Sequence, residues 1–341
     1  MKIITCASYY GSGSSAVTDL LSEFDDVLSL GESEYRFLQD PDGISDLEYS
    51  VIENNHRHNT SDSIKKYIKY SKSLGGFGYA NTYNVFDGYF ETYTNEFINE
   101  ITELKVKTWW HKDRIDRGFL FSYIDRLYSI VKRLLLGKLK SESKFSILQN
   151  TEYGYYTSIN EEKFLQAVRS YTRKLFTCVN KEDKPFVMVD QLVPPSNVMR
   201  YARYFDAIKI VVVDRDPRDI YLSEKEIWQW GVIPYKSVDD FVKWFKITRC
   251  CSRNICEDPS VVLRIKFEDL IFNYEETRKR ILEFIGISSD SNCDKKSHFI
   301  PLESIKNTNL QRKYPQHKRD IEFIERELAD YLYQFPNIQT E

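Results

Sequence analysis

The sequence predicts an α/β fold in which a parallel sheet is flanked by helices and interrupted by a mostly helical insertion. At both ends of the chain, short apolar runs rich in β-branched residues alternate with segments of helical periodicity. Over 40–180 strand-like runs are scarce and helical periodicity prevails. Strands that alternate with helices imply a parallel sheet with crossover connections. We therefore expect one domain over 1–341 that carries an insertion at 40–180.

The first elements follow from the local pattern. The apolar run KIITCAS at 2–8 predicts a strand, and the glycines and serines of 9–15 predict a turn. AVTDLLSEF at 16–24 has helical spacing, and VLSL at 27–30 predicts the second strand. This order, strand, loop, helix and strand, is the start of a parallel sheet.

Elements of the same kind return after residue 185. The expected strands are 186–190, 207–214 and 261–267. The expected helices are 197–205, a helix opened by Pro217, 273–286 with Gly286 as its stop, and roughly 318–334. The two halves of the sheet are then separated by the insertion, which we expect to form a lid or acceptor wall over the carboxyl edge of the sheet.

Within the insertion, residues 103–144 are basic, with 11 Lys or Arg against 5 Asp or Glu, a local net charge of +6. An apolar stripe runs through this segment at helical spacing and consists of Leu120, Ile124, Leu127, Val131 and Leu134. The favoured interpretation is a helix whose stripe faces the core and whose basic face is solvated. A groove for an anionic acceptor and a helix on a membrane surface are the alternatives.

Composition excludes several classes of protein. The net charge of -3 and the pI of about 6.1 argue against a general nucleic-acid binder. The start of the chain lacks a signal-peptide pattern, and no uncharged apolar stretch reaches the roughly 18 residues of a membrane span. We expect a cytoplasmic protein without a stable span, for which peripheral membrane contact stays open. The six cysteines form no CxxC pair, which favours reduced structural thiols over a metal site.

The first candidate site is the segment YYGSGSSA at 9–16, which lies between a strand and a helix. Glycines permit tight turns, and successive backbone N–H groups at a helix start form an anion cradle. The predicted sheet is therefore P-loop-like. No Gly-Lys-Ser/Thr follows, so the phosphate-bridging lysine of a kinase is missing. Taken alone, the segment is also compatible with a plain turn capped by serine.

The second candidate site is VVVDRDPRDIYLS at 211–223, where a strand delivers Arg215 at its carboxyl end and a helix carries Ser223 eight residues later. The planar fork of Arg215 suits a phosphate, and Ser223 lies about two helical turns on. The alternative is an exposed Arg-Asp ladder at a helix start.

In this order the two segments resemble the PAPS-dependent sulfotransferase family, in particular its carbohydrate-type, bacterial-like branch. The resemblance implies that 11–15 binds the 5′ end of PAPS and that Arg215 and Ser223 bind the 3′-phosphate. Two later segments are also similar to the family: 262–287, and 311–335 with its basic donor-covering loop. The resemblance covers roughly 1–40 and 185–335. The donor-binding residues that it implies are Gly11, Ser12, Gly13, Ser14, Ser15, Arg215, Ser223, Arg312 and Lys313.

One position departs from the family pattern. The family has Lys or Arg directly before the Ser-Gly of the loop, where the cation steadies the transferring sulfuryl group, and this chain has Gly11 there. Lys225, Arg312 and Lys313 are the candidates to replace that cation.

The resemblance also implies a catalytic base, because the attacking hydroxyl must lose its proton. In the carbohydrate-type branch this base is a glutamate after the second strand, and LGESEYRFLQD makes Glu34 the first candidate and Glu32 the second. A solvated acidic loop is the alternative. Three histidines of the insertion rank lower: His56, His58 and His111.

The expected function is transfer of a sulfuryl group from PAPS to a hydroxyl of a saccharide or polysaccharide precursor, with PAP as product. The alternative is a catalytically degenerate member that binds a nucleotide or a partner. The oligomeric state is not predicted.

Overall fold

The computed structural model describes residues 1–75, 80–136, 145–250, 256–288, 291, 293 and 295–336. Its centre is a five-stranded sheet in the order β2-β5-β1-β6-β7. Every neighbouring pair in this sheet is parallel, so all five carboxyl ends lie at one edge. The strands are β1 (Lys2–Ser8), β2 (Val27–Glu34), β5 (Phe186–Asp190), β6 (Ile208–Asp214) and β7 (Val262–Lys266). The predicted α/β class and parallel sheet are confirmed.

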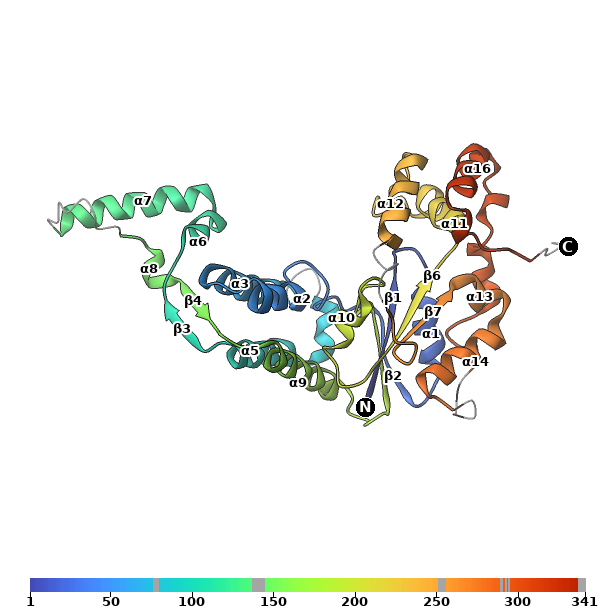
Figure 1. Cartoon of the computed structure of the whole chain (residues 1–341), viewed down its shortest axis with the longest axis horizontal. Helices are drawn as coiled ribbons and strands as arrows, with labels where there is room; N and C mark the ends of the chain where they lie inside the picture. The colour runs from blue at the N-terminus through green and yellow to red at the C-terminus, as the bar shows by residue number, and fades with distance from the viewer. Residues whose placement is uncertain are drawn as a thin grey trace.

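Helices cover both faces of the sheet because the strand residues alternate between two apolar cores. Ile3 and Ala7 of β1 pack into one core, whereas Ile4 and Cys6 pack into the other. The second core also receives helices α1, α13 and α14 (Figure 1). The helices of this part are α1 (Ser15–Ser22), α10 (Val198–Ala202), α11 (Pro217–Leu222), α12 (Val238–Cys250), α13 (Phe267–Phe272), α14 (Tyr274–Ile285), α15 (Pro301–Ser304) and α16 (Lys318–Glu327).

Several short turns of non-α helix complete this part. The helix that Pro217 opens continues beyond Leu222 as a π-helix, which carries Ser223 at its first position. The remaining 3-10 turns lie toward the end of the chain. The π-helix is η3 (Ser223–Trp228), and the 3-10 turns are η4 (Ile305–Asn307), η5 (Leu310–Arg312), η6 (Pro315–His317) and η7 (Ala329–Tyr331).

The insertion is mostly helical, as predicted, but it also contains a two-stranded antiparallel ribbon that the sequence pattern did not indicate. Its strands are β3 (Leu104–Lys107) and β4 (Tyr153–Tyr156). Its helices are α2 (Ile44–Glu48), the π-helix η1 (Tyr49–Glu53), α3 (Arg57–Leu74), α4 (Ala80–Tyr83), the 3-10 turn η2 (Asn84–Phe86), α5 (Tyr89–Ile101), α6 (His111–Asp116), α7 (Gly118–Leu135), α8 (Leu148–Thr151) and α9 (Glu161–Val179).

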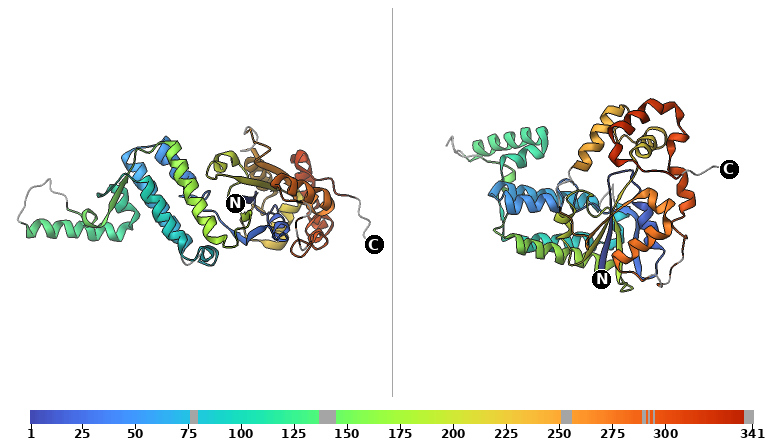
Figure 2. Two further views of the ribbon diagram at one scale, coloured as in Figure 1. Left: turned by 90° about the horizontal axis from the view of Figure 1, so that it is seen from below. Right: turned by 45° about the vertical axis from the view of Figure 1, so that its right-hand side comes forward.

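The insertion extends sideways from the sheet as an arm, with α6 and α7 at its free end (Figures 1 and 2). Its inner part is anchored by α9 and α5, whose Phe97, Phe164 and Tyr171 belong to the same core as Ile3 and Ala7. No helix among the described residues is long and apolar enough to cross a membrane.

Candidate active site

The loop after β1 is held in a sharp turn by unusual backbone angles. Tyr10 and Gly11 both have left-handed φ values, 63° and 64°, and Gly13 has a φ of 86°. The hydroxyl of Ser12 donates to the carbonyl oxygen of Val213 at 2.7 Å and accepts from the N–H of Tyr9 at 3.2 Å. Ser12 is fully buried, so its side chain fastens the loop to β6. Its hydroxyl is thus already used within the protein, and the place of Ser12 in the donor site stays a prediction.

Both loop glycines are required by their neighbours. A Cβ on Gly11 would lie 2.9 Å from the ring of Trp228, and a Cβ on Gly13 would lie 2.4 Å from the ring of Phe267. Position 11 is thus filled by an aromatic ring of the π-helix, which occupies the space that a loop lysine would need.

Arg215 meets this loop at the same edge of the sheet, as predicted. Its Nη1 donates to the carbonyl oxygen of Gly11 at 3.0 Å, and its Nη2 donates to Oγ of Ser223 at 3.0 Å and to the carbonyl oxygen of Asn307 at 2.5 Å. Its Nε is buried and has no hydrogen-bond partner in the part of the chain that the structure describes. The guanidinium therefore retains two of its five N–H donors, one on Nη1 and one on Nε, beside the Ser223 hydroxyl.

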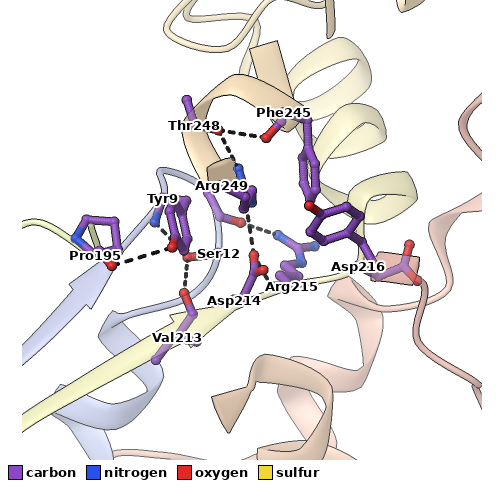
Figure 3. Close-up of polar contacts among 12 residues, drawn as sticks. Tyr9, Ser12, Pro195, Val213, Asp214, Arg215, Asp216, Phe245, Thr248 and Arg249 are labelled. Atoms are coloured by element: carbon purple, nitrogen blue, oxygen red, sulfur yellow. Dashed lines mark hydrogen bonds and ion pairs between the residues drawn. The ribbon is translucent and has the colours of Figure 1, made fainter. Parts of the chain in front are cut away.

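A second arginine, which no sequence motif indicated, supports this arrangement (Figure 3). Arg249 of α12 donates to Oδ1 of Asp214 at 2.8 Å, and the same oxygen accepts from the N–H of Arg215 at 2.9 Å. The Arg249 guanidinium also lies 4.3 Å from the ring centroid of Tyr9. This buried arginine thus joins the loop after β1 to the end of β6.

A cavity of about 570 Å³ opens between the loop and the Arg215 segment. Gly11, Gly13, Ser14 and Ser15 line it together with Arg215 and Ser223. Its aromatic wall consists of Tyr10, Trp228, Trp230, Phe267 and Phe299, and its carboxylates are Asp19, Glu34, Asp190 and Glu224. Arg215 is the one Lys or Arg among the described lining residues.

Two of these carboxylates face each other across neighbouring strands. Glu34 of β2 is paired with Asp190 of β5, and the side chain of Glu34 is about half exposed, at 49%. Asp190 is buried, and this burial, reinforced by the charge of Glu34, raises the pKa of its carboxyl to about 7. Asp190 ends the predicted strand 186–190, where a polar residue after an apolar run could have suggested a site residue.

The three predicted cations do not line this cavity. Arg312, Lys313 and Lys225 are absent from its wall, and Lys225 instead pairs with Asp320 at 2.9 Å. The expectation that one of them fills the place of the loop cation stays a prediction. Glu32 lies in β2, but its side chain is outside the described part of the structure.

The insertion does not line the cavity either. None of the cavity's described lining residues comes from 40–180, and the expected lid over the carboxyl edge stays a prediction. His56 and His58 line a different cavity, which lies between α3 and α6, and His111 is the first residue of α6. The role of the insertion in binding an acceptor stays a prediction. Among the described residues no cluster of three metal-ligating side chains occurs, and Cys251 lies outside them.

The fold and the site define an α/β protein with a glycine-containing loop and an arginine at one edge of a parallel sheet. Residues 133–291 match the model of the sulfotransferase family. The matched range contains the Arg215–Ser223 segment, and it leaves out the loop at 9–15. The match covers somewhat less than half of the chain, and it makes this part of the chain similar to sulfotransferases.

No curated protein matches the chain. Among solved structures, it is similar to retinol dehydratase in complex with androsterone and inactive cofactor PAP. The two share 16% sequence identity over 98% of this chain and 83% of that chain, with a TM-score of 0.32. At that score the likeness assigns neither a site nor an acceptor.

Proposed function

We propose that this enzyme transfers a sulfuryl group from PAPS to a hydroxyl of a saccharide or a polysaccharide precursor, and that the donor binds in the cavity between the loop at 9–15 and Arg215. The observation that carries the proposal is the meeting of Arg215, Ser223 and Gly11 within hydrogen-bond distance. When bound, PAPS supplies the activated sulfuryl group. The protein binds the donor, orients the acceptor hydroxyl and removes its proton.

The donor set fits a phosphorylated nucleotide. The buried Nε of Arg215 lacks a partner, and such an orphaned donor costs stability unless a ligand satisfies it. Ser223 adds a hydroxyl at 3.0 Å from the same guanidinium. We assign these two residues to the 3′-phosphate. Gly13, Ser14 and Ser15, which line the cavity at the start of α1, are assigned to the 5′ end.

The cation that the loop lacks has a candidate in Arg36. Its Nη2 donates to Oη of Tyr10 at 2.9 Å, and its guanidinium lies 5.4 Å from the centroid of that ring. Tyr10 lines the cavity and directly precedes Gly11. Arg36 also pairs with Asp40 at 2.7 Å, which holds it in this position. We propose that Arg36 places positive charge at the sulfuryl end of the cavity.

Glu34 is proposed as the base. Its carboxylate is partly exposed on the cavity wall, where an acceptor hydroxyl can approach it. Asp190 lies opposite but is buried, so it suits the role of a neighbouring charge better than contact with an incoming sugar. Glu32 remains the second candidate from the sequence.

One observation favours the alternative of a degenerate member that binds without turnover. Four carboxylates and a single cation line the described cavity wall, and this balance opposes an anionic donor. Arg36 and the backbone N–H groups of the loop must offset that charge if the enzyme is active.

A transfer assay with sulfur-labelled PAPS separates the two functions. The acceptor panel contains neutral and acidic oligosaccharides, and a steroid alcohol serves as the non-saccharide control. Label on a saccharide, lost in Arg36→Ala, supports the proposal. Label on the steroid alone contradicts the saccharide acceptor, whereas PAP binding without transfer to any member of the panel favours the degenerate alternative.

A further inference from the structure

Helix α7 is oriented with its polar edge toward the protein and its apolar face toward solvent. Asp125 is 1% exposed and Ser129 is also buried, whereas Phe119 is 86% exposed and Leu120 and Leu134 are each 75% exposed. The sequence pattern had favoured the opposite orientation, with the stripe in the core. That expectation is wrong for this helix.

A network of polar contacts fixes the orientation. The Asp125 carboxylate pairs with Arg114 at 2.8 Å, accepts from the hydroxyl of Ser146 at 2.9 Å and accepts from the N–H of Ile147 at 2.7 Å. Separating a buried carboxylate from its hydrogen-bond and ion-pair partners costs free energy. Rotation of α7 to bury its leucines would break all three contacts, so the outward apolar face is specified by the fold.

The exposed face is wide and continuous. At 100° per residue its members fall within about 160° of the helix circumference, a little less than half. They are Phe119, Leu120, Tyr123, Ile124, Leu127, Ile130, Val131, Leu134 and Leu135, all of which are classed as exposed large hydrophobic side chains. A contiguous apolar surface of this kind marks a binding surface. It lies at the free end of the arm, away from the sheet, in all three views (Figures 1 and 2).

Basic side chains border this face. Segment 104–136 contains eight Lys or Arg against three Asp, although the whole chain has a net charge of -3. Lys132 donates to Tyr128 and Arg133 donates to Ser129. Within the described part of the chain, neither of these two side chains nor exposed Arg126 has an ion pair with a carboxylate. Long basic side chains beside an apolar face reach the charged headgroups when that face enters a bilayer.

The positive charge beside the apolar face of α7 indicates what kind of partner binds there. A second copy of the chain on a two-fold axis would bring the same basic side chains together, and like charges oppose such an interface. An anionic lipid surface offers the complementary charge and also accepts the leucines and aromatic rings. The helix cannot span the bilayer, because no described helix meets the length and apolarity of a span. We propose that α7 lies flat in the headgroup region of an anionic membrane and attaches the protein to it.

The test is flotation of the full chain with vesicles of phosphatidylcholine alone and of phosphatidylcholine mixed with phosphatidylglycerol. We expect binding to the mixed vesicles that weakens as salt is added. Changing Leu120, Leu127 and Leu134 together to serine removes apolar burial and is expected to weaken binding by at least about a hundredfold. Arg126→Ser and Lys132→Ser are each expected to weaken it about fivefold.

Leu302→Ser is the matched control, because Leu302 is 79% exposed but lies on α15. It is expected to bind vesicles like the unchanged chain. Failure of the unchanged protein to float with the mixed vesicles would overturn the proposal, and so would full binding by the triple variant. Sedimentation showing a dimer that the triple variant converts to a monomer would assign the face to a second copy instead. These changes lie on α7 and α15, outside the cavity that we assign to the donor, so PAP binding is expected to be unchanged and the outcome to be independent of the proposed function.

Discussion

Arg215 at the end of β6 donates from Nη2 to Oγ of Ser223 at 3.0 Å, and from Nη1 to the carbonyl oxygen of Gly11 at 3.0 Å. The loop after β1, the end of β6 and the start of η3 thus meet at one guanidinium. The Nε of the same group is buried and has no hydrogen-bond partner among the described residues.

Ser223→Ala tests the hydroxyl of this cluster. A hydrogen bond to a charged group contributes about 1.5–3 kcal/mol, so we expect PAP affinity to fall by roughly tenfold to a hundredfold. Ser71→Ala is the control, because Ser71 is also buried but lies on α3. Titration calorimetry that finds equal PAP affinity in both variants would remove Ser223 from the donor site.

Gly11→Lys is not expected to restore a family-like loop. The new Cβ would lie 2.9 Å from Trp228, and a φ of 64° disfavours a side chain at this position. We expect the free energy of unfolding to fall by roughly 1–3 kcal/mol, measured by denaturant titration. Gain of sulfate transfer without loss of stability would show that the Trp228 ring leaves enough space for a lysine side chain at position 11.

Asp190→Asn is expected to change how stability depends on pH. The folded-state pKa of about 7 lies above the ordinary value of 3.8, so the unfolded chain releases this proton first as pH rises. The contribution of the protonated Asp190 to the free energy of unfolding is therefore fully present below about pH 4 and is lost progressively up to about pH 7. The Asn variant lacks this loss and is expected to be more stable by a few kcal/mol at neutral pH. Parallel slopes for both proteins between pH 4 and 7 would contradict the raised pKa.

Glu34→Gln tests the base. The change preserves shape and removes basicity, so turnover is expected to fall by about 10² to 10⁴ while PAP affinity stays nearly unchanged. Full turnover in single-turnover kinetics with an accepted substrate would move the role to Glu32 or Asp190. Loss of PAP binding as well would make Glu34 a structural residue.

The sequence was sufficient for the parts of the site that lie within short segments. The loop after β1 and the Arg215–Ser223 segment each follow an apolar run directly, and parallel strands bring their carboxyl ends to one edge. The order of the strands in the sheet could not be predicted in the same way. The pairing of Glu34 with Asp190 requires β5 to lie between β2 and β1, and no local pattern states that order.

Side-chain orientation was the other feature beyond the reach of periodicity. A stripe at helical spacing shows that α7 is amphipathic, but either face can turn inward. Burial of Asp125 by Arg114 and Ser146, which are distant in sequence, decides the orientation. Similarly, the ring of Trp228 beside Gly11 depends on the π-helix after Leu222, which separates this chain from the family pattern at the loop.

Thermal melting with PAP and with AMP tests the central claim most directly, because the two ligands differ by the 3′-phosphate assigned to Arg215. We expect PAP to raise the melting temperature more than AMP, since a ligand at 100 times its Kd adds about 2.7 kcal/mol of stability. In Arg215→Ala the PAP advantage is expected to disappear, as affinity falls by roughly tenfold to a hundredfold or more. Equal shifts with PAP and AMP in the unchanged protein, or a PAP advantage that survives in Arg215→Ala, would contradict the donor site described here.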